Sequence, residues 1–211
     1  MAGTVALQGG GPFEANDELD RRLLGSVGAG RVVVLPTADA YEHPERLVAS
    51  AMNWAERLDV EVEALMVMRR AEANDLGAAA VAASATAVYL VGDQPLHLRS
   101  VLKDTPLWEA IVGVADGGGL VVGVGGSADA LCDPMIDPRG GAFTLGLGLV
   151  RGLALVTMAE TWSPERLHRT KELADTTLAT LPTGAALVRT GGVWENVGDA
   201  EVHGDLPATT P

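Results

Sequence analysis

Short apolar runs separated by segments with helical spacing constrain the fold of this chain more than any other feature. The runs are rich in valine and continuous rather than alternating, which is typical of strands buried on both faces of a parallel sheet. Each has the length of a strand, and none approaches the ~20 residues that would cross a bilayer. The five predicted strands are Thr4–Leu7, Arg31–Leu35, Val60–Met66, Ala87–Val91 and Leu120–Val124.

The segments between the runs carry the apolar periodicity of helices. One repeats every four residues and another follows the i, i+4, i+7, i+11 stripe of an amphipathic helix. Alternating strands and helices predict right-handed βαβ crossovers, and hence an α/β fold with a doubly wound, mostly parallel sheet and helices on both faces. Ligands of such sheets bind beyond the carboxyl ends of the strands. The two apolar stripes are Ala15, Leu19, Leu23, Val27 and Leu47, Ala51, Trp54, Leu58.

The second half of the chain does not continue this alternation of strands and helices. Residues 133 to 150 are rich in proline and glycine, which predicts a structured loop, and Ser163 followed by Pro164 is a favourable helix start. A hairpin is expected around Gly191 and Gly192. No repeat or boundary divides the chain, so we expect a single domain over residues 1–204 and a flexible tail over 205–211.

Composition excludes several classes of function. A net charge of −13 without a basic cluster would repel a phosphate backbone or an acidic membrane surface, so neither nucleic acid nor membrane is an expected partner. The single cysteine, Cys132, has no partner for an internal disulfide, and the first residues lack the features of a secretory signal. We therefore expect a cytoplasmic protein. No pattern of metal ligands or phosphate-binding glycines is present, so no metal and no cofactor are expected.

The most suggestive chemical motif follows the last predicted strand. Gly125, Gly126 and Ser127 precede a helix-compatible segment, an order that resembles the nucleophile elbow of serine hydrolases, in which glycines permit a strained strand-to-helix turn. The alternative interpretation is a glycine-rich turn in which Ser127 caps the helix. The motif alone does not choose between these interpretations.

The wider sequence resembles the peptidase S51 family, which includes dipeptidase E and cyanophycinase and has a class I glutamine amidotransferase-like, flavodoxin-like fold. The resemblance extends over about residues 4 to 200. It implies a serine hydrolase that cleaves peptide or isopeptide bonds next to acidic residues, with Ser127 at the nucleophile position. The resembling segments are Gly9–Gly11, Val34–Ala38, Tyr89–Gly92, Pro95–Pro106, Gly126–Ala128, Asp133–Gly141 and Trp162–Thr170.

Three positions depart from the pattern that the resemblance implies. Met158 stands where the family has its catalytic histidine, and a thioether cannot accept a proton near neutral pH. Asp93 replaces the second of two glycines beside the oxyanion site, where a carboxylate would oppose the developing charge. Asp129 replaces a glycine behind the nucleophile, although an acid there also suits a helix N-terminus.

The remaining positions of the implied site are retained. Asp133 is the candidate acidic partner, although an aspartate before proline is also an ordinary turn residue. The positions that the resemblance assigns to the oxyanion and substrate site are Gly10, Gly11, Gly92, Asp93, Ala128, Asp129 and Arg139.

The leading hypothesis is a divergent S51-like protein that lacks ordinary peptidase activity and keeps a pocket for a small molecule or short peptide, or for altered chemistry. An active serine peptidase or amidase is the alternative, and it requires another base. Of the four histidines, His97 is the best candidate because it follows the end of a strand expected to neighbour Ser127. A purely structural role, with a vestigial pocket, is the third reading. A homodimer is compatible with such a fold, but no residue pattern specifies one.

Overall fold

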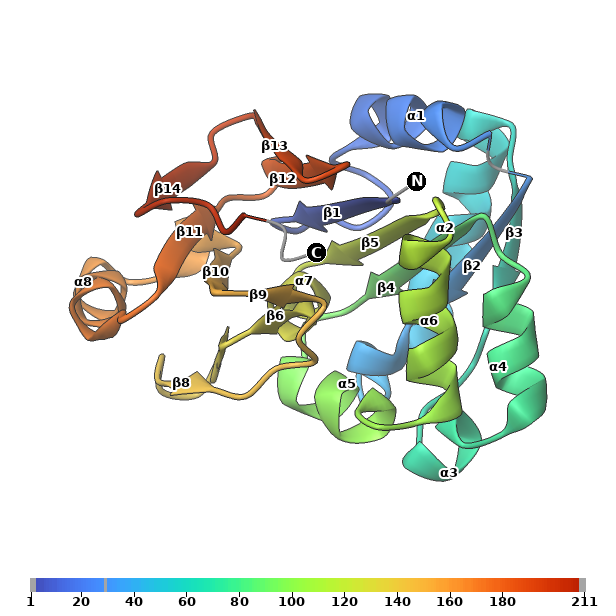
Figure 1. The fold of residues 1–211 in the computed structure, drawn as a ribbon, viewed down its shortest axis with the longest axis horizontal. Helices are drawn as coiled ribbons and strands as arrows, with labels where there is room; N and C mark the ends of the chain where they lie inside the picture. The colour runs from blue at the N-terminus through green and yellow to red at the C-terminus, as the bar shows by residue number, and fades with distance from the viewer. Residues whose placement is uncertain (1–2, 29, 209–211) are drawn as a thin grey trace.

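The computed structural model describes residues 3–28 and 30–208, which form two sheets with helices around them (Figure 1). The larger sheet has seven strands in the order β13-β12-β1-β5-β4-β2-β3. Its parallel part is formed by the five strands that the apolar runs predict, which confirms the α/β class. These strands are β1 (Thr4–Gln8), β2 (Arg31–Leu35), β3 (Glu61–Ala64), β4 (Ala87–Val91) and β5 (Leu120–Val124).

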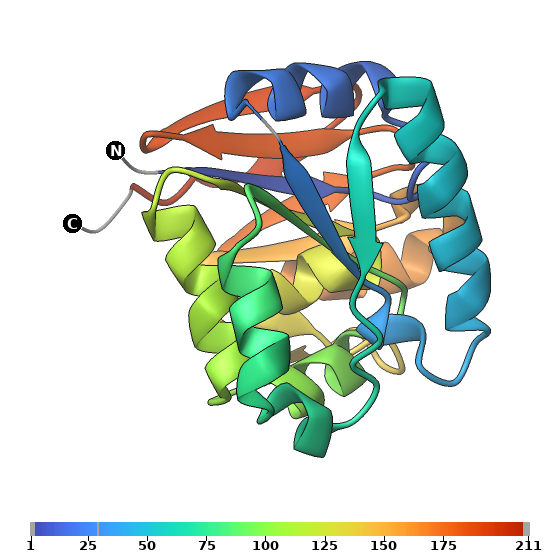
Figure 2. The ribbon, with the colours of Figure 1, turned by 90° about the vertical axis from the view of Figure 1, so that its right-hand side faces the viewer.

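Helices cover both faces of this sheet (Figure 2). On one face α1 (Asp17–Ser26) and α2 (Pro44–Leu58) bury their apolar stripes against the strands. The opposite face packs on four helices. Among the described residues, no helix has both the length and the apolar character needed to cross a membrane. The helices of the second face are α4 (Leu76–Ala83), α5 (Pro95–Leu102), α6 (Pro106–Asp116) and α7 (Gly126–Leu131), and α3 (Arg70–Ala73) precedes α4.

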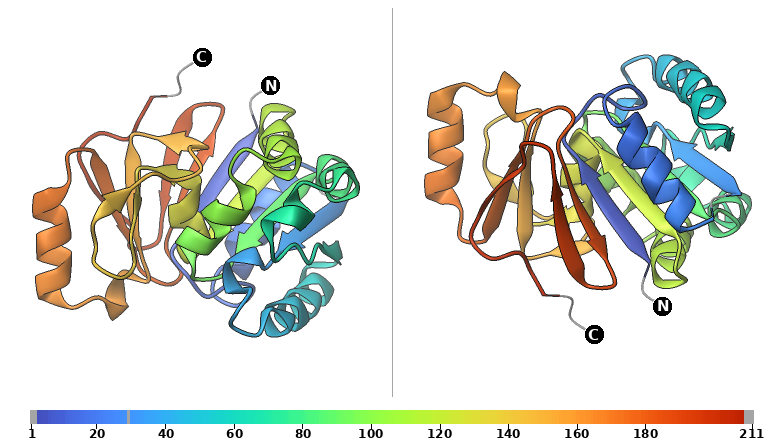
Figure 3. Two further views of the ribbon diagram at one scale, coloured as in Figure 1. Left: turned by 90° about the horizontal axis from the view of Figure 1, so that it is seen from below. Right: turned by 90° about the horizontal axis from the view of Figure 1, so that it is seen from above.

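A second sheet, which the sequence pattern did not predict, lies beside the first. Its order is β14-β11-β10-β6-β9, and a separate two-stranded ribbon pairs β7 with β8. The helix expected after Ser163 is α8 (Pro164–Leu173), and the Ser163 hydroxyl caps it by accepting a hydrogen bond from Arg166 N at 3.2 Å. Figure 3 shows α8 on the outer side of the second sheet. The strands are β6 (Cys132–Asp133), β7 (Met135–Ile136), β8 (Phe143–Thr144), β9 (Val150–Arg151), β10 (Leu153–Thr157), β11 (Thr177–Leu181) and β14 (Glu201–His203).

The C-terminal part of the chain returns to the first sheet. The predicted hairpin is formed by β12 (Ala186–Thr190) and β13 (Val193–Val197), and β12 pairs antiparallel with β1. Beyond Gly204, the Asp205 carbonyl accepts a hydrogen bond from the Thr177 hydroxyl at 2.6 Å, and the Pro207 carbonyl accepts one from the Trp194 indole at 2.9 Å. Asp205 and Pro207, which belong to the predicted tail, are therefore held against the domain, and 209–211 lie outside the described residues.

A buried carboxyl group joins α1 to the end of β1. Asp20 is 1% exposed and accepts hydrogen bonds from Gln8 Nε2 at 2.7 Å and from the Tyr89 hydroxyl at 3.1 Å. Asn16 donates to Gln8 Oε1 at 3.2 Å. Burial raises the pKa of Asp20 from 3.8 to about 6, although both donors favour the charged form. This network fixes the strand end from which the Gly9–Gly11 loop begins.

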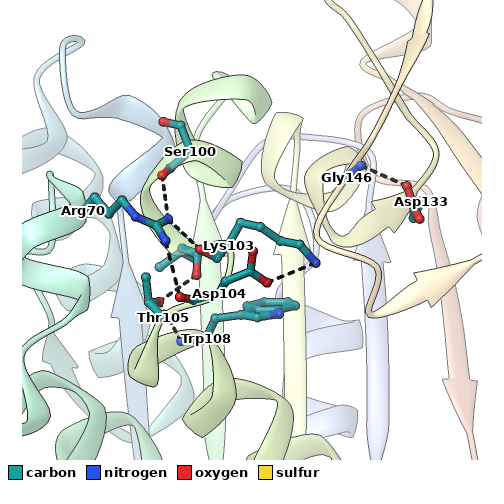
Figure 4. Close-up of polar contacts among 9 residues, drawn as sticks. Arg70, Ser100, Lys103, Asp104, Thr105, Trp108, Asp133 and Gly146 are labelled. Atoms are coloured by element: carbon teal, nitrogen blue, oxygen red, sulfur yellow. Dashed lines mark hydrogen bonds and ion pairs between the residues drawn. The ribbon is translucent and has the colours of Figure 1, made fainter.

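Two short helices are tied together by a single arginine. The Arg70 guanidinium of α3 donates to the carbonyls of Ser100, Lys103 and Asp104 at the end of α5 (Figure 4). These carbonyls lie where a helix leaves its last acceptors unpaired. Arg70 thus caps α5 at the end remote from Asp93.

Candidate functional site

A cavity of about 180 Å³ lies where the carboxyl ends of the parallel strands meet the second sheet. This is the edge at which doubly wound sheets bind ligands. Its lining comes from the segment after β4, from α7, from β10 and from α8 and the turn before it. The lining residues are Asp93, Pro95, Gly126, Asp129, Ile136, Pro138, Leu155, Thr157, Met158, Thr161, Trp162 and Arg166.

Gly125 is the residue with a strained backbone conformation in the turn between β5 and α7. Gly125 has φ 64° and ψ −135°, and α7 begins at the next residue. Such a conformation is open to glycine and costs other residues on the order of 1–3 kcal/mol. In a nucleophile elbow the strained residue between strand and helix is the one whose side chain is presented above the sheet. Gly125 has no side chain to present.

Ser127 lies two residues later, inside α7. It is fully buried, and its hydroxyl donates to the Gly92 carbonyl at 3.1 Å, beside the Ser127 N–H bond to the same oxygen at 2.9 Å. Among the described residues, no histidine forms a hydrogen bond with the Ser127 hydroxyl: His97 Nε2 is paired with the Met68 carbonyl at 3.0 Å. The structure gives Ser127 a helix-anchoring contact and no base.

The Asp93 carboxylate fills the space that a side chain at Gly125 would need. A Cβ on Gly125 would lie 2.3 Å from Asp93 Oδ1, and the same oxygen accepts a hydrogen bond from Gly126 N at 3.3 Å. Asp93 is exposed as a residue, but this carboxyl oxygen faces inward. Burial of the carboxyl, together with the nearby Asp39 carboxylate, raises the pKa of Asp93, while the Gly126 N–H opposes the rise. The backbone donor that follows the elbow is therefore occupied by the chain itself.

Met158 lines the cavity from the turn after β10. Its φ of 47° and ψ of 46° are unusual for a residue with a long side chain. Its N–H donates to the Gly9 carbonyl at 2.9 Å, and its side chain lies so near Gly10 that a Cβ there would be 2.8 Å from Met158 Cγ. Met158 and the loop of Gly10 and Gly11 are thus brought together, but this position offers no group that could act as a base.

Asp129 is a residue of α7 and lines the wall of the cavity. It is 4% exposed, and both carboxyl oxygens accept from Ile136 N, at 3.0 and 3.1 Å. Burial raises the pKa of Asp129 well above 3.8 despite these bonds, which favours the neutral acid. Ala128 is buried beside it in α7. Asp129 adds a buried carboxyl to the wall and also holds the end of β7 through Ile136 N.

Seven of the ten predicted site residues do not line the cavity: Ser127, Asp133, Gly10, Gly11, Gly92, Ala128 and Arg139. Asp133 belongs to β6, where its carboxylate accepts from Gly146 N at 3.1 Å (Figure 4). Arg139 is exposed and pairs with Asp137. Gly92 lies behind the cavity wall, with φ 114° and its carbonyl turned to Ser127. Asp133 and Gly92 thus make contacts that support the local structure, and Arg139 projects from the loop that follows β7.

Nine of the twelve cavity residues were not anticipated from the sequence, among them Thr157, Trp162 and Arg166. Thr157 is 8% exposed at the end of β10, and its hydroxyl has no hydrogen-bond partner within the described residues. The Arg166 guanidinium stacks on the Trp162 ring, 3.6 Å from its centroid. All three lie on or beside segments whose packing depends on the second sheet. Trp162 and Arg166 could have been anticipated, because the segment Trp162–Thr170 is one of those that resemble the S51 family.

The cavity wall formed by α8 is fastened to the loop at Pro138–Gly141 by polar contacts. Arg166 donates to the Pro138 carbonyl, Arg169 Nη2 donates to the Gly140 carbonyl at 2.6 Å, and the Thr170 hydroxyl donates to the Gly141 carbonyl at 3.4 Å. Thr170 is the one residue of α8 that is fully buried. Leu167 of α8 also packs against the apolar cluster that includes Val156 and Leu178, so the helix is attached by both kinds of contact.

Comparison with known proteins places this arrangement among peptidases. No family model and no curated protein matches the sequence. Among solved structures, a peptidase from an acI-B1 Actinobacterium matches with a TM-score of 0.85 and 26% identity, over 96% of this chain and 90% of that one. The chain has a peptidase S51-like fold. The "Putative Peptidase E Protein" from Listeria monocytogenes EGD-e matches with a TM-score of 0.69 and 15% identity, over 96% of this chain and 98% of that one.

The S51-like fold explains why the cavity lies where it does. The resemblance anticipated from sequence is confirmed for the architecture. The helix expected after Ser163 is α8, whereas the segment predicted as a structured loop, residues 133 to 150, contains parts of the short strands β6 to β9. The fold does not determine the roles of individual residues, which depend on the geometry of the site.

Proposed function

We propose that this S51-like protein does not perform serine hydrolysis and instead binds a small ligand in the pocket that the fold provides. The observation that carries the proposal is the glycine at the strained elbow residue. If Gly125 holds the nucleophile position, the chain lacks the nucleophile as well as the base. Counted from Gly123, the spacing G-x-nucleophile-x-G puts Gly125 at the nucleophile position, with Ser127 in place of the final glycine.

The polar contacts around the elbow support the same conclusion. Covalent catalysis needs an activated nucleophile and free donors for the oxyanion. Ser127 is buried with its hydroxyl committed to the Gly92 carbonyl, and the Gly126 N–H is committed to Asp93. A substrate carbonyl would have to displace a carboxylate in order to use that donor. Hydrolysis by the ordinary route has neither its attacking group nor its free oxyanion site.

The same cavity nevertheless supports binding. Polar side chains remain on the wall. The Thr157 hydroxyl has no hydrogen-bond partner among the described residues, and the buried carboxyl of Asp129 also lines the cavity. A pocket that retains such groups is better suited to a ligand with polar atoms than to a purely structural role.

A fluorophosphonate probe tests the hydrolytic part of the proposal. We expect no covalent labelling of the wild-type protein and no release of amino acids from acidic dipeptides or from a β-aspartyl isopeptide. A serine hydrolase labelled in parallel serves as the positive control for the probe. Ser100→Ala, which removes an exposed hydroxyl far from the cavity, is the matched variant for Ser127→Ala.

Stoichiometric labelling would refute the proposal if it disappears in Ser127→Ala, persists in Ser100→Ala and is accompanied by turnover. That result would establish the alternative, an active serine peptidase or amidase with an unrecognised base. Absence of covalent labelling and of amino-acid release with the wild-type protein would support the loss of hydrolysis.

A further inference from the structure

The cavity is lined by a carboxylate, that of Asp93, and by a guanidinium, that of Arg166, which do not form an ion pair with each other. Asp93 enters it from the end of β4 in the seven-stranded sheet, and Arg166 enters from α8 beyond the second sheet. Within the described residues no ion pair joins them. Two opposite charges kept apart in one small cavity constrain the charges of anything that binds between them.

The Asp93 end has unused capacity to accept hydrogen bonds. Oδ1 accepts from Gly126 N, and Oδ2 accepts from no group in the described part of the chain. The nearest acid is Asp39, whose Oδ1 accepts from Asp93 N at 2.8 Å. A positively charged donor placed here would relieve the repulsion between the two carboxylates, which acts in a partly buried setting where screening is weak.

The Arg166 end has unused capacity to donate. Stacking on Trp162 fixes the plane of the guanidinium, and Nη2 is bound to the Pro138 carbonyl. Nε is buried without a hydrogen-bond partner, and Nη1 donates to no described residue. An oriented guanidinium with free N–H groups matches a carboxylate better than a lysine ammonium would.

Between the two ends the wall combines polar and apolar surface. Thr157 supplies a hydroxyl and Asp129 a carboxyl that already accepts from Ile136 N, whereas Ile136, Leu155 and Pro95 supply apolar surface. A volume of about 180 Å³ is slightly larger than the ~150 Å³ cavity that holds benzene and well below the ~300–1,000 Å³ of drug-sized sites. The space suits a ligand of roughly six to ten non-hydrogen atoms.

We propose that the cavity binds a free small α-amino acid as a zwitterion, with the ammonium group at Asp93 and the carboxylate at Arg166. A dicarboxylate would place its second charge against Asp93, a diamine would place one against Arg166, and dipeptides of eleven or more non-hydrogen atoms, from alanylalanine upward, exceed the space. This inference rests on the proposed ligand-binding function and names its ligand class.

Isothermal titration calorimetry tests the charge pattern on the ligand side. Glycine, L-alanine, L-serine, L-valine and L-leucine would be titrated singly into the full chain. We expect at least one to bind, and expect its N-acetyl derivative and its carboxamide each to bind at least tenfold more weakly. Binding that survives either block unchanged, or no binding of any of the five at millimolar concentration, would overturn the proposal.

Variants test the same pattern on the protein side. Asp93→Asn and Arg166→Gln each remove one charge, and Arg46→Gln, an exposed arginine of α2 that does not line the cavity, is the control. We expect at least a tenfold loss of affinity in the first two and none in the control, with thermal unfolding used to verify that each variant is folded. Equal affinity in all three folded variants would contradict the assignment.

The two proposals fail in different ways. If the protein binds none of the five amino acids and is not labelled by the fluorophosphonate probe, the zwitterion assignment is wrong and the proposed loss of hydrolysis is retained. If it is labelled at Ser127 and hydrolyses peptides, the proposed function is wrong whatever it binds.

Discussion

The buried carboxyl of Asp20 predicts that this protein loses stability as the pH rises. Its pKa is about 6 in the folded state against 3.8 for an exposed aspartate, so the folded chain binds this proton more tightly than the unfolded chain does. The stabilisation from this group is complete below pH 3.8 and is lost as the pH rises through about 6. The whole effect corresponds to about 3 kcal/mol.

The substitution Asp20→Asn isolates this effect, because Asn keeps an oxygen to accept from Gln8 and Tyr89 but does not titrate. Its unpaired amide adds a cost that does not depend on pH. The measurement is therefore the change between pH 5 and pH 8 in the stability difference between wild type and variant. This range avoids the isoelectric point near 4.6. Over it we expect the variant to gain roughly 1.4 kcal/mol relative to wild type.

Urea denaturation at the two pH values, followed by circular dichroism, provides the free energies of unfolding. Glu18→Gln, which removes an exposed acid from the same helix, is the control and should show no comparable change between the two pH values. A difference between wild type and Asp20→Asn that shifts by less than about 0.5 kcal/mol from pH 5 to pH 8 would refute the reasoning.

Two further predictions concern the elbow. Ser127→Ala removes the hydrogen bond to the Gly92 carbonyl, so we expect a loss of about 1 kcal/mol in urea denaturation and no change in amino-acid affinity; a loss of binding without a loss of stability would contradict the structural role of this hydroxyl. Gly125→Ala places a Cβ 2.3 Å from Asp93 Oδ1 at φ 64°, so we expect a loss of about 1–3 kcal/mol. In the double variant with Asp93→Gly the loss should be smaller than the sum of the single losses, and strict additivity in this double-mutant cycle would show that the two groups do not compete for the space.

The parallel part of the larger sheet could be predicted because each of its strands is a continuous apolar run. Four of the five predicted runs match β1, β2, β4 and β5 to within one residue, and the fifth is longer than β3 at both ends. Within the second sheet, β6 and β9 escaped prediction because strands of two residues are too short to carry a period. They form because neighbouring segments supply hydrogen-bond partners.

The candidate site could be located but not resolved in detail from sequence. Asp93, Asp129 and Met158 do line one cavity, since all three lie at or near the carboxyl edge of the sheets. The elbow residue could not be decided, because three glycines precede Ser127 and the choice depends on where α7 begins. Thr157 and Arg166 join the site only through the packing of β10 and α8, which no local pattern specifies.

The polar fastening of α8 has a consequence for how the cavity communicates with solvent. Segments with few buried apolar contacts open at a lower free energy than the core to which they are attached. The carbonyls of Pro138, Gly140 and Gly141 can exchange their partners for water while both sheets stay intact. Amide hydrogens of α8 should therefore exchange with solvent ahead of those of β10 and β11. Arg166 would move with the helix, so the entrance of the cavity and its positive end would open in a single local event.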